Sequence, residues 1–335
     1  MRPSAVRIPL SRAGLLFPFL EILDRIGAPT DRGLERHNLP AGVRENPEML
    51  VSTRARAAFL GDMARREGIT EFGWRATRPQ AVQRLSPGLD RTLRRSPTLL
   101  QALETVPTRV TRESTHVQVW LEDRDDGLFF CHRDFREFGE QEELTLLRTA
   151  VMLSIVQLFT GPDWVPTDCA FAIQGEIGPV VREELGDTRI RRAPDCSWMR
   201  LPRSILPHPP RARVATEAGS GADRPEPALD LAGSLVRLLR PYLSAGAPTI
   251  RDAAGLAGTS VRSLQRALTH AGTSFTDVLQ RARLEAAREL FQQPDIKIVD
   301  VAHETGFSDH AHFVRFFRRL AGMTPRDYRA TLTSE

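Results

Sequence analysis

The side chains best suited to chemistry in this sequence stand in two short polar sets near its C-terminal end. The first set is Arg262, Ser263, Gln265 and Arg266, and the second is His310, Ala311, His312 and Arg315. Arginine can donate two hydrogen bonds to O6 and N7 of guanine, and glutamine can pair with N6 and N7 of adenine, each pair giving about 1–3 kcal/mol of discrimination between bases. If each set shares the outer side of a helix, these residue types suit contact with DNA.

A group of histidines in the same region suggests a different chemistry. His303, His310 and His312, with Asp309, have the side-chain types of a metal site. However, His303 falls in a different predicted helix from the other two histidines, and no cysteine is nearby, so we do not expect these side chains to converge on one ion. The sequence therefore predicts no metal site and assigns no cofactor.

The cysteines suggest a nucleophile, but only weakly. Cys131 stands beside His132, with Asp134 two residues further on. Because neighbouring residues on a strand point to opposite faces, a buried cysteine is the better interpretation. Cys169 and Cys196 lack the spacing of metal ligands, and no phosphate-binding loop, nucleophile elbow or dinucleotide fingerprint occurs. These absences remove the commonest enzyme hypotheses.

The two polar sets belong to two copies of one pattern. Five residues recur 48 positions later: Ile250, Asp252, Ala254, Gly258 and Ser260 return as Ile298, Asp300, Ala302, Gly306 and Ser308. Each copy predicts a helix-turn-helix, in which the glycine closes the first helix and the serine caps the second. The buried stripe of the second helix is Val261, Leu264 and Leu268 in the first copy and Phe313, Phe316 and Phe317 in the second. This leaves the two polar sets on the outer sides.

A strong helix pattern joins the two copies. It covers Thr276 to Phe291, about 16 residues and so about 24 Å at 1.5 Å per residue. Such a spacer suits two helices that enter successive major-groove faces, which lie about 34 Å apart. A small helical bundle is the alternative, but the duplicated glycines, caps and arginines favour DNA binding.

Residues 235–330 resemble the DNA-binding domain of AraC/XylS-type transcriptional regulators. The matching stretches are SVRSLQRALTHAGTSFTDVLQRARLEAARELF and IVDVAHETGFSDHAHFVRFFRRLAGMTPRDYR. The second carries the family pattern almost in full from Ala302 to Arg329, while the first departs from it at Ala267, where the family often has a bulkier residue.

The resemblance implies that each second helix enters the major groove and that both polar sets face base edges or phosphates. Arg318 and Arg319, near the end of the second copy's helix, would contact phosphates, which position a protein without specifying sequence. It also implies double-stranded promoter DNA and RNA polymerase as partners, and activation as the sign of regulation.

The N-terminal part mixes helix and strand patterns. Helices are predicted over Leu15–Ile26, Val51–Glu67 and Leu144–Phe159. A hairpin is predicted from strands at Thr115–Leu121 and Leu128–His132, with its turn at Glu122–Gly127. Shorter candidate strands lie at Phe171–Ile177 and Ser197–Leu201. The segment IRRAPDCSWMRLPRSIL is similar to the arabinose-binding-like sensor domain of one AraC subgroup. The predicted fold is an α+β N-terminal domain, with mixed helices and a small sheet, followed by an all-α domain with two helix-turn-helix motifs.

Aromatic residues of the N-terminal part are candidates for an apolar pocket, although plain core is the better interpretation. They are Trp120, Phe129, Phe130, Phe159, Phe171 and Trp198. No ligand-binding residue is assigned from them.

Composition sets the domain organisation. The chain has 335 residues, 46 basic and 42 acidic, for a net charge of +4. A Pro- and Gly-rich stretch predicts a flexible linker at 207–228, between an effector-sensing and dimerisation domain at 1–206 and a DNA-binding domain at 229–335. The sequence has only three cysteines and no signal-peptide pattern. Its longest apolar run, Thr149–Phe159, is about half the length that spans a membrane. Together these features predict a cytoplasmic protein without a membrane partner.

Two hypotheses follow. The first is a sequence-specific regulator that responds to a small-molecule effector of unknown identity and forms a homodimer through its N-terminal domain. The alternative is an enzyme, such as a DNA-modifying or repair protein, fused to the same DNA-binding domain. That alternative needs a nucleophile or metal site in residues 1–205, and the sequence shows none.

Overall fold

The computed structural model describes residues 8–78, 81–134, 142–212 and 230–332. The chain divides into two compact units, whose main segments are Pro9–Glu226 and Pro227–Glu335. Each unit is described by itself.

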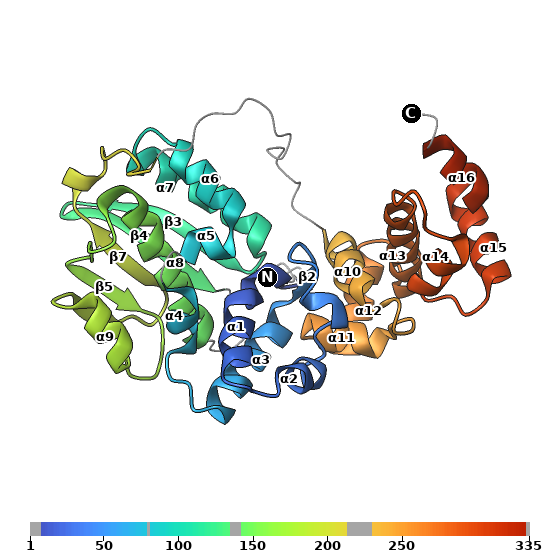
Figure 1. The fold of residues 1–335 in the computed structure, drawn as a ribbon, viewed down its shortest axis with the longest axis horizontal. Helices are drawn as coiled ribbons and strands as arrows, with labels where there is room; N and C mark the ends of the chain where they lie inside the picture. Colours follow the sequence, from blue (N-terminus) through green and yellow to red (C-terminus); the bar gives the residue numbers. More distant parts are fainter. Residues whose placement is uncertain (1–7, 79–80, 135–141, 213–229, 333–335) are drawn as a thin grey trace. The chain divides into compact units, whose positions relative to one another are not determined.

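The N-terminal unit is a mixed sheet with helices packed against it (Figure 1). Its helices are α1 (Phe17–Arg25), α2 (Thr30–Arg36), α3 (Thr53–Arg66), α4 (Phe72–Thr77), α5 (Ala81–Leu85), α6 (Pro87–Arg95), α7 (Leu99–Glu113), α8 (Glu142–Thr160) and α9 (Pro179–Leu185). Its strands are β1 (Leu10–Arg12), β2 (Leu50–Ser52), β3 (Val117–Arg124), β4 (Gly127–Asp134), β5 (Asp168–Phe171), β6 (Arg189–Arg192) and β7 (Ser197–Leu201).

The five-stranded sheet has the order β3-β4-β7-β5-β6, and β1 and β2 form a separate antiparallel pair. Within the larger sheet only the β5–β6 pair is parallel. The predicted hairpin is present as β3 and β4, but its strands extend to Arg124 and resume at Gly127, so the turn is shorter than predicted. The candidate strand at Phe171–Ile177 is wrong in its extent, because β5 ends at Phe171, while Ser197–Leu201 forms β7 as predicted.

Helix α8 is the central element of the N-terminal unit. It contacts β4, β5 and β7 and also α3, α4 and α5. Leu144 and Leu147 belong to one apolar cluster, which they share with α1 and α3, and Leu146 and Ala150 belong to another, which they share with the sheet. Among the described residues α8 alone is long and apolar enough to cross a membrane, but 72% of its most apolar window is buried inside the protein. The burial is that of a core helix, which is the interpretation made from the sequence.

The chain stays bonded to the N-terminal unit into the stretch predicted as a linker. The Leu99 N–H donates to the His208 carbonyl (2.9 Å), and the Arg211 N–H donates to the Leu158 carbonyl near the end of α8 (2.9 Å). Gly161, which follows α8, has φ of +110°, and a Cβ there would lie 2.7 Å from the Arg211 guanidinium carbon. These contacts fix His208 to the start of α7 and Arg211 to the last turn of α8. Most of the predicted linker lies outside the described residues.

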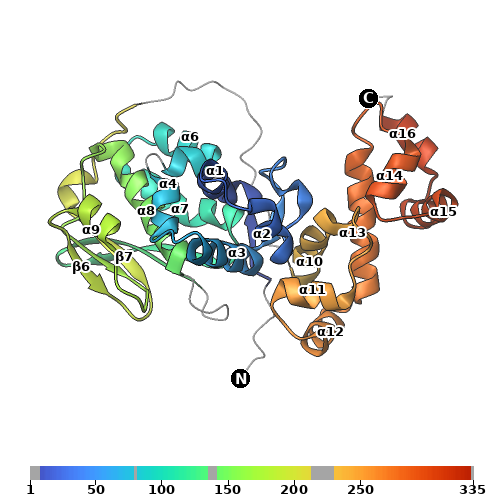
Figure 2. The same cartoon turned by 60° about the horizontal axis from the view of Figure 1, so that its bottom comes forward.

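Helices are the regular elements of the C-terminal unit in its described part, which contains no strand, so the predicted fold class is confirmed in both units. Its α-helices are α10 (Leu231–Leu239), α11 (Ile250–Ala257), α12 (Val261–His270), α13 (Phe275–Leu290), α14 (Ile298–Glu304), α15 (His310–Ala321) and α16 (Pro325–Leu332). Two helix pairs, α11–α12 and α14–α15, lie on either side of α13 in both views (Figures 1 and 2). The predicted spacer is therefore one continuous helix, with its start one residue earlier than expected.

Candidate nucleic-acid interface

The first helix pair is closed as the sequence predicts. Gly258 ends α11 with φ of +69°, a conformation that glycine adopts without a Cβ penalty. The Ser260 hydroxyl then accepts a hydrogen bond from the Ser263 N–H (3.1 Å) and caps α12. Leu264 and Leu268 are buried on the inner side of α12.

The first polar set lies on the opposite side of α12 from these leucines. Arg262, Gln265 and Arg266 are exposed. Ser263 differs from the other three, because it is half-buried and its hydroxyl accepts a hydrogen bond from the Ser260 hydroxyl (3.0 Å). Three side chains of the set are therefore presented to solvent, and the fourth supports the start of the helix.

The second pair uses a different cap from the one predicted. The sequence assigns the cap of α15 to Ser308, but the Asp309 carboxylate accepts from the Ala311 N–H (3.0 Å) and the His312 N–H (3.1 Å). Each carboxylate oxygen of Asp309 accepts from one of the two free N–H groups at the start of the helix. The cap has therefore moved by one residue relative to the first copy.

The second polar set is exposed along α15. His310, Ala311, His312 and Arg315 are all exposed, as are Arg318 and Arg319 further along the helix. Arg315 Nη2 lies 3.9 Å from Asp309 Oδ2, with the two side chains 71% and 61% exposed. An ion pair so open to solvent contributes about 0–1 kcal/mol, so it leaves Arg315 available for another anionic or hydrogen-bonding partner.

One residue that ties α13 to the second pair has no signal in the sequence pattern. The Arg283 Nη2 on α13 donates to the Gly306 carbonyl (3.1 Å), and its guanidinium carbon lies 4.4 Å from the centre of the Phe307 ring. Gly306 itself has φ of +78°, and a Cβ there would meet the Leu243 carbonyl oxygen at 2.7 Å. The turn of the second pair is therefore held by the spacer helix and tolerates only glycine without strain.

The alternative chemistries do not assemble. His303 lies on α14 and His310 and His312 on α15, and across the described ranges no three His, Cys, Asp or Glu side chains are grouped as a metal site would need. In the N-terminal unit, burial raises the pKa of Cys131 and of Cys169 to about 12, so both thiols are protonated near neutral pH. The side chain of Asp134 lies outside the described part.

The candidate pocket aromatics are divided between core and sheet surface. Phe129, Phe130, Phe159 and Phe171 are buried, which agrees with the core interpretation, and the Phe129 ring packs edge-on against Trp198 with centroids 5.1 Å apart. Trp120 is half-buried beneath the Arg133 guanidinium, 5.4 Å from its ring.

Known helix-turn-helix proteins are similar to this chain in sequence. Residues 253–331 match the family described as "Helix-turn-helix domain". The chain is 36% identical over 155 residues to the HTH-type transcriptional regulator GlxA of Rhizobium meliloti, a match that covers 45% of this chain and 44% of GlxA. It is 26% identical over 341 aligned residues to the HTH-type transcriptional regulator VirS of Mycobacterium tuberculosis, with 96% of each covered. The crystal structure of the transcriptional regulator CdpR from Pseudomonas aeruginosa aligns with 90% of this chain and 96% of its own, at 17% identity and a TM-score of 0.35.

The paired helices and the family match define a DNA-binding helix-turn-helix protein. More narrowly, the C-terminal unit is of the AraC type, and the protein is a transcriptional regulator.

Proposed function

We propose that the protein recognises a specific DNA sequence by inserting α12 and α15 into adjacent major-groove segments, with Arg266 and Arg315 contacting bases. The observation that carries this proposal is their equivalence: each arginine is exposed and stands on the outer side of the second helix of its pair, two residues before the buried Leu268 or Phe317. Arg262, Gln265, His310 and His312 are the other candidates for base contact. Arg318 and Arg319 are the candidates for phosphate contact, with Ser263 supporting the helix start and Ala311 allowing close approach of the backbone.

The test starts with selection of bound duplexes from a random pool by the full-length protein. Dissociation constants are then measured by fluorescence anisotropy on the selected duplex and on a panel with each base pair changed. Arg266→Ala is expected to weaken binding to the selected duplex by about 10- to 100-fold and to relax the preference at one base pair, because a bidentate pair is worth about 1–3 kcal/mol.

Arg288→Ala is the matched control, since Arg288 is an exposed arginine of the same unit on the spacer helix. It is expected to change neither affinity nor preference. A uniform loss on every duplex with Arg266→Ala would show a phosphate contact instead, and failure to select any sequence would refute the proposal.

We also propose that DNA binding responds to a small-molecule effector held by the N-terminal unit, that the protein is a homodimer through this unit and that it activates RNA polymerase in the cytoplasm. The resemblance to AraC/XylS-type regulators supports activation. In-vitro transcription from a promoter that holds the selected sequence tests activation, and light scattering of the purified protein tests the dimer. A monomer, or transcription unaffected by the protein, would contradict the respective part.

We propose that the N-terminal unit has no catalytic role. The relatives named above are regulators. Burial raises the pKa of all three cysteines, Cys131, Cys169 and Cys196, so the described part of that unit offers no ready thiolate. Turnover of DNA or of any small molecule by the purified protein would favour the enzyme alternative.

A further inference from the structure

One helix, α13, joins the two helix-turn-helix pairs of the C-terminal unit. In its first half Val278 and Ala282 are buried, and α13 contacts α10, which in turn contacts α11 of the first pair. In its second half Ala287 belongs to the apolar cluster that α14 and α15 form. The two pairs are therefore connected through different halves of the same helix, and both ribbon views show one pair on each side of it (Figures 1 and 2).

Arg283, near the middle of α13, reaches the turn of the second pair. Its Nη2 donates to the Gly306 carbonyl (3.1 Å), and its guanidinium carbon lies 4.4 Å from the centre of the Phe307 ring. Gly306 and Phe307 both lie between α14 and α15. The hydrogen bond fixes the direction of the flat guanidinium, and the ring contact fixes its plane. Arg283 therefore resists rotation of the second pair about α13.

The Arg283 side chain is held by these contacts rather than by water. It is half-buried, and its Nε is buried with no hydrogen-bond partner within the described residues. Burial lowers the pKa of the guanidinium, although arginine remains charged in proteins. Removing a charge from water is costly unless other groups replace the lost hydration. The Gly306 carbonyl and the Phe307 ring provide that replacement, so the side chain has a defined position.

The same turn rests against the chain that leads into the first pair. A Cβ on Gly306 would lie only 2.7 Å from the Leu243 carbonyl oxygen, so the two backbones are in close contact. Leu243 is fully buried and follows the 3-10 helix η5 (Arg240–Tyr242), which contacts α13. Gly306 is therefore held both by Arg283 of the joining helix and by the segment before α11.

We infer that Arg283 is a positioning residue that fixes the orientation of the two helix pairs relative to each other, and thereby the number of base pairs between the two DNA segments that the protein reads. The statement about DNA rests on the proposed function, whereas the fixed orientation does not. One added base pair moves the second segment by about 3.4 Å along the duplex and turns it by about 35°. Two pairs in fixed orientation cannot follow this change, but loosened pairs can.

The first measurement uses the duplex selected by the full-length protein and the same duplex with one base pair inserted between its two contacted segments. The wild-type protein is expected to bind the lengthened duplex at least ten times more weakly, because the base contacts of one pair are lost. Arg283→Met keeps the aliphatic stem but removes the donor and the flat cation, and should reduce this ratio to less than about three. A second pair that was merely less stable would weaken binding to both duplexes by the same factor and leave the ratio unchanged.

Arg281→Met is the matched control, because Arg281 is an exposed arginine of the same helix, paired with Glu285 (2.8 Å). It is expected to keep the wild-type ratio. Circular dichroism shows whether Arg283→Met folds; if it does not, Phe307→Leu removes the ring beside the guanidinium and, when folded, should lower the ratio in the same direction. A wild-type protein that tolerates the insertion, or a folded Arg283→Met protein with the wild-type ratio, would overturn the inference.

A measurement without DNA separates this inference from the proposed function. Spin labels are attached to the full-length protein at His270→Cys on α12 and Glu304→Cys on α14, both exposed positions, with Cys196→Ser to avoid a third label. Double electron–electron resonance, with the labelled protein diluted in unlabelled protein, should give one narrow distance distribution. Arg283→Met should broaden it, and Arg281→Met should not.

Each result of this measurement decides one question. A broad distribution without Arg283→Met, or a narrow one that persists with it, would overturn the fixed orientation. The expected distributions combined with failure to select any duplex would refute the proposed function and leave the positioning role of Arg283 within the C-terminal unit standing.

Discussion

The two helix-turn-helix pairs share one plan but are stabilised differently. In the first, Thr249 and Asp252 form a capping box at the start of α11, and the buried side of α12 is aliphatic. In the second, Lys297 stands at the start of α14 with no side-chain cap. That pair is packed by rings instead, a cluster of Phe291, Phe307, Phe313, Phe316, Phe317 and Tyr328. The two copies of the sequence pattern therefore form the same helix-turn-helix, although one is stabilised by a capping box and aliphatic packing and the other by packed aromatic rings.

The exposed sides differ as well. Two arginines and a glutamine dominate α12, whereas α15 presents two histidines, an alanine and an arginine before Arg318 and Arg319. Bidentate base contacts are available to the first set in greater number. In the second set only Arg315 can make such a contact, while Arg318 and Arg319 are candidates for phosphate contact. We therefore expect the first pair to contribute more than the second to the preference for a DNA sequence.

The contrast in packing predicts its largest effect on the free energy of unfolding. The substitutions that test it are Phe317→Ala in the second pair and Leu268→Ala at the equivalent position of the first pair. Phe317 is fully buried, and its ring lies 5.4 to 5.8 Å from the rings of Phe291, Phe313 and Tyr328. Phe317→Ala should cost about 3–5 kcal/mol of unfolding free energy, and Leu268→Ala about 2–5 kcal/mol.

Urea denaturation followed at two signals measures these costs. All four tryptophans, Trp74, Trp120, Trp164 and Trp198, are in the N-terminal unit. Tryptophan fluorescence should therefore keep its midpoint, while the circular dichroism transition of the helical unit moves to lower urea. A larger cost for Leu268→Ala than for Phe317→Ala would contradict the distinction between the ring-packed and the aliphatic pair.

A smaller effect is expected at the glycines of the two turns. Gly258→Ala places an alanine at φ of +69° and should cost about 1–2 kcal/mol. Gly306→Ala should cost more, because its Cβ would also meet the Leu243 carbonyl and shift the bond from Arg283. The same denaturation measures both, and a lower cost at Gly306 would show that the second turn is the more adaptable one.

The smallest effect concerns the caps. Asp309→Ala removes two hydrogen bonds at the start of α15, and Ser260→Ala removes one at the start of α12, so each should cost about 1 kcal/mol, with Asp309 the larger. Ser308→Ala should cost little, since Ser308 is exposed and does not cap the helix. Thermal unfolding detected by circular dichroism can rank the three, and a larger loss at Ser308 would contradict the observed cap.

The C-terminal unit was predictable because its signals are local and duplicated. Gly258 and Ser260 act within one turn of the chain, and the stripe of phenylalanines on α15 has a clear helical period. The shift of the cap from Ser308 to Asp309 could not be seen, because both residue types cap helices well and only geometry decides between them.

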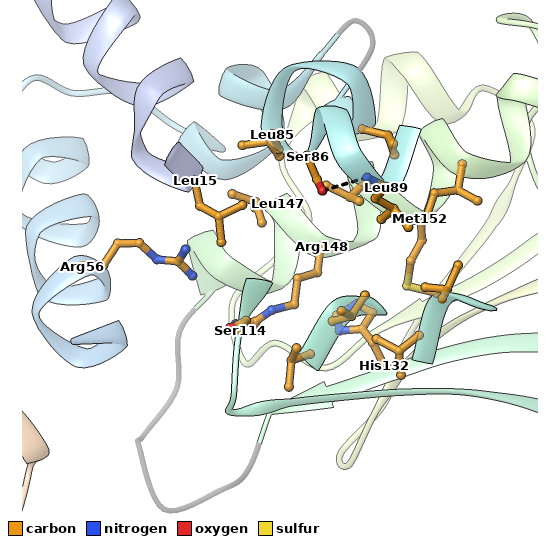
Figure 3. A pocket seen from close by; sticks show the side chains of 17 residues that line it. Leu15, Arg56, Leu85, Ser86, Leu89, Ser114, His132, Leu147, Arg148 and Met152 are labelled. Atoms are coloured by element: carbon orange, nitrogen blue, oxygen red, sulfur yellow. Dashed lines mark hydrogen bonds between the residues drawn. The ribbon is translucent and has the colours of Figure 1, made fainter. Parts of the chain in front are cut away.

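The N-terminal unit was predictable only where its elements are long. Strand β6 is the charged segment RIRR, with Arg191 paired to Asp168 on the neighbouring strand, and β1 and β2 have three residues each, so none has an alternating apolar pattern. An apolar cavity of about 80 Å³ beside α8, which Arg148 lines (Figure 3), was missed because a buried arginine has no local signature. Arg148 did offer one clue, since it stands between Leu147 and the most apolar run of the sequence.

Helix α8 has one further consequence. Its second turn carries Arg148, which lines the apolar cavity of the N-terminal unit, and its final turn supplies the Leu158 carbonyl that accepts from the Arg211 N–H. Arg148 and Leu158 are ten residues apart on this one helix, which corresponds to about 15 Å along its axis. A shift of α8 along its axis would therefore also move Arg211, because the Arg211 N–H is bonded to the last turn of this helix.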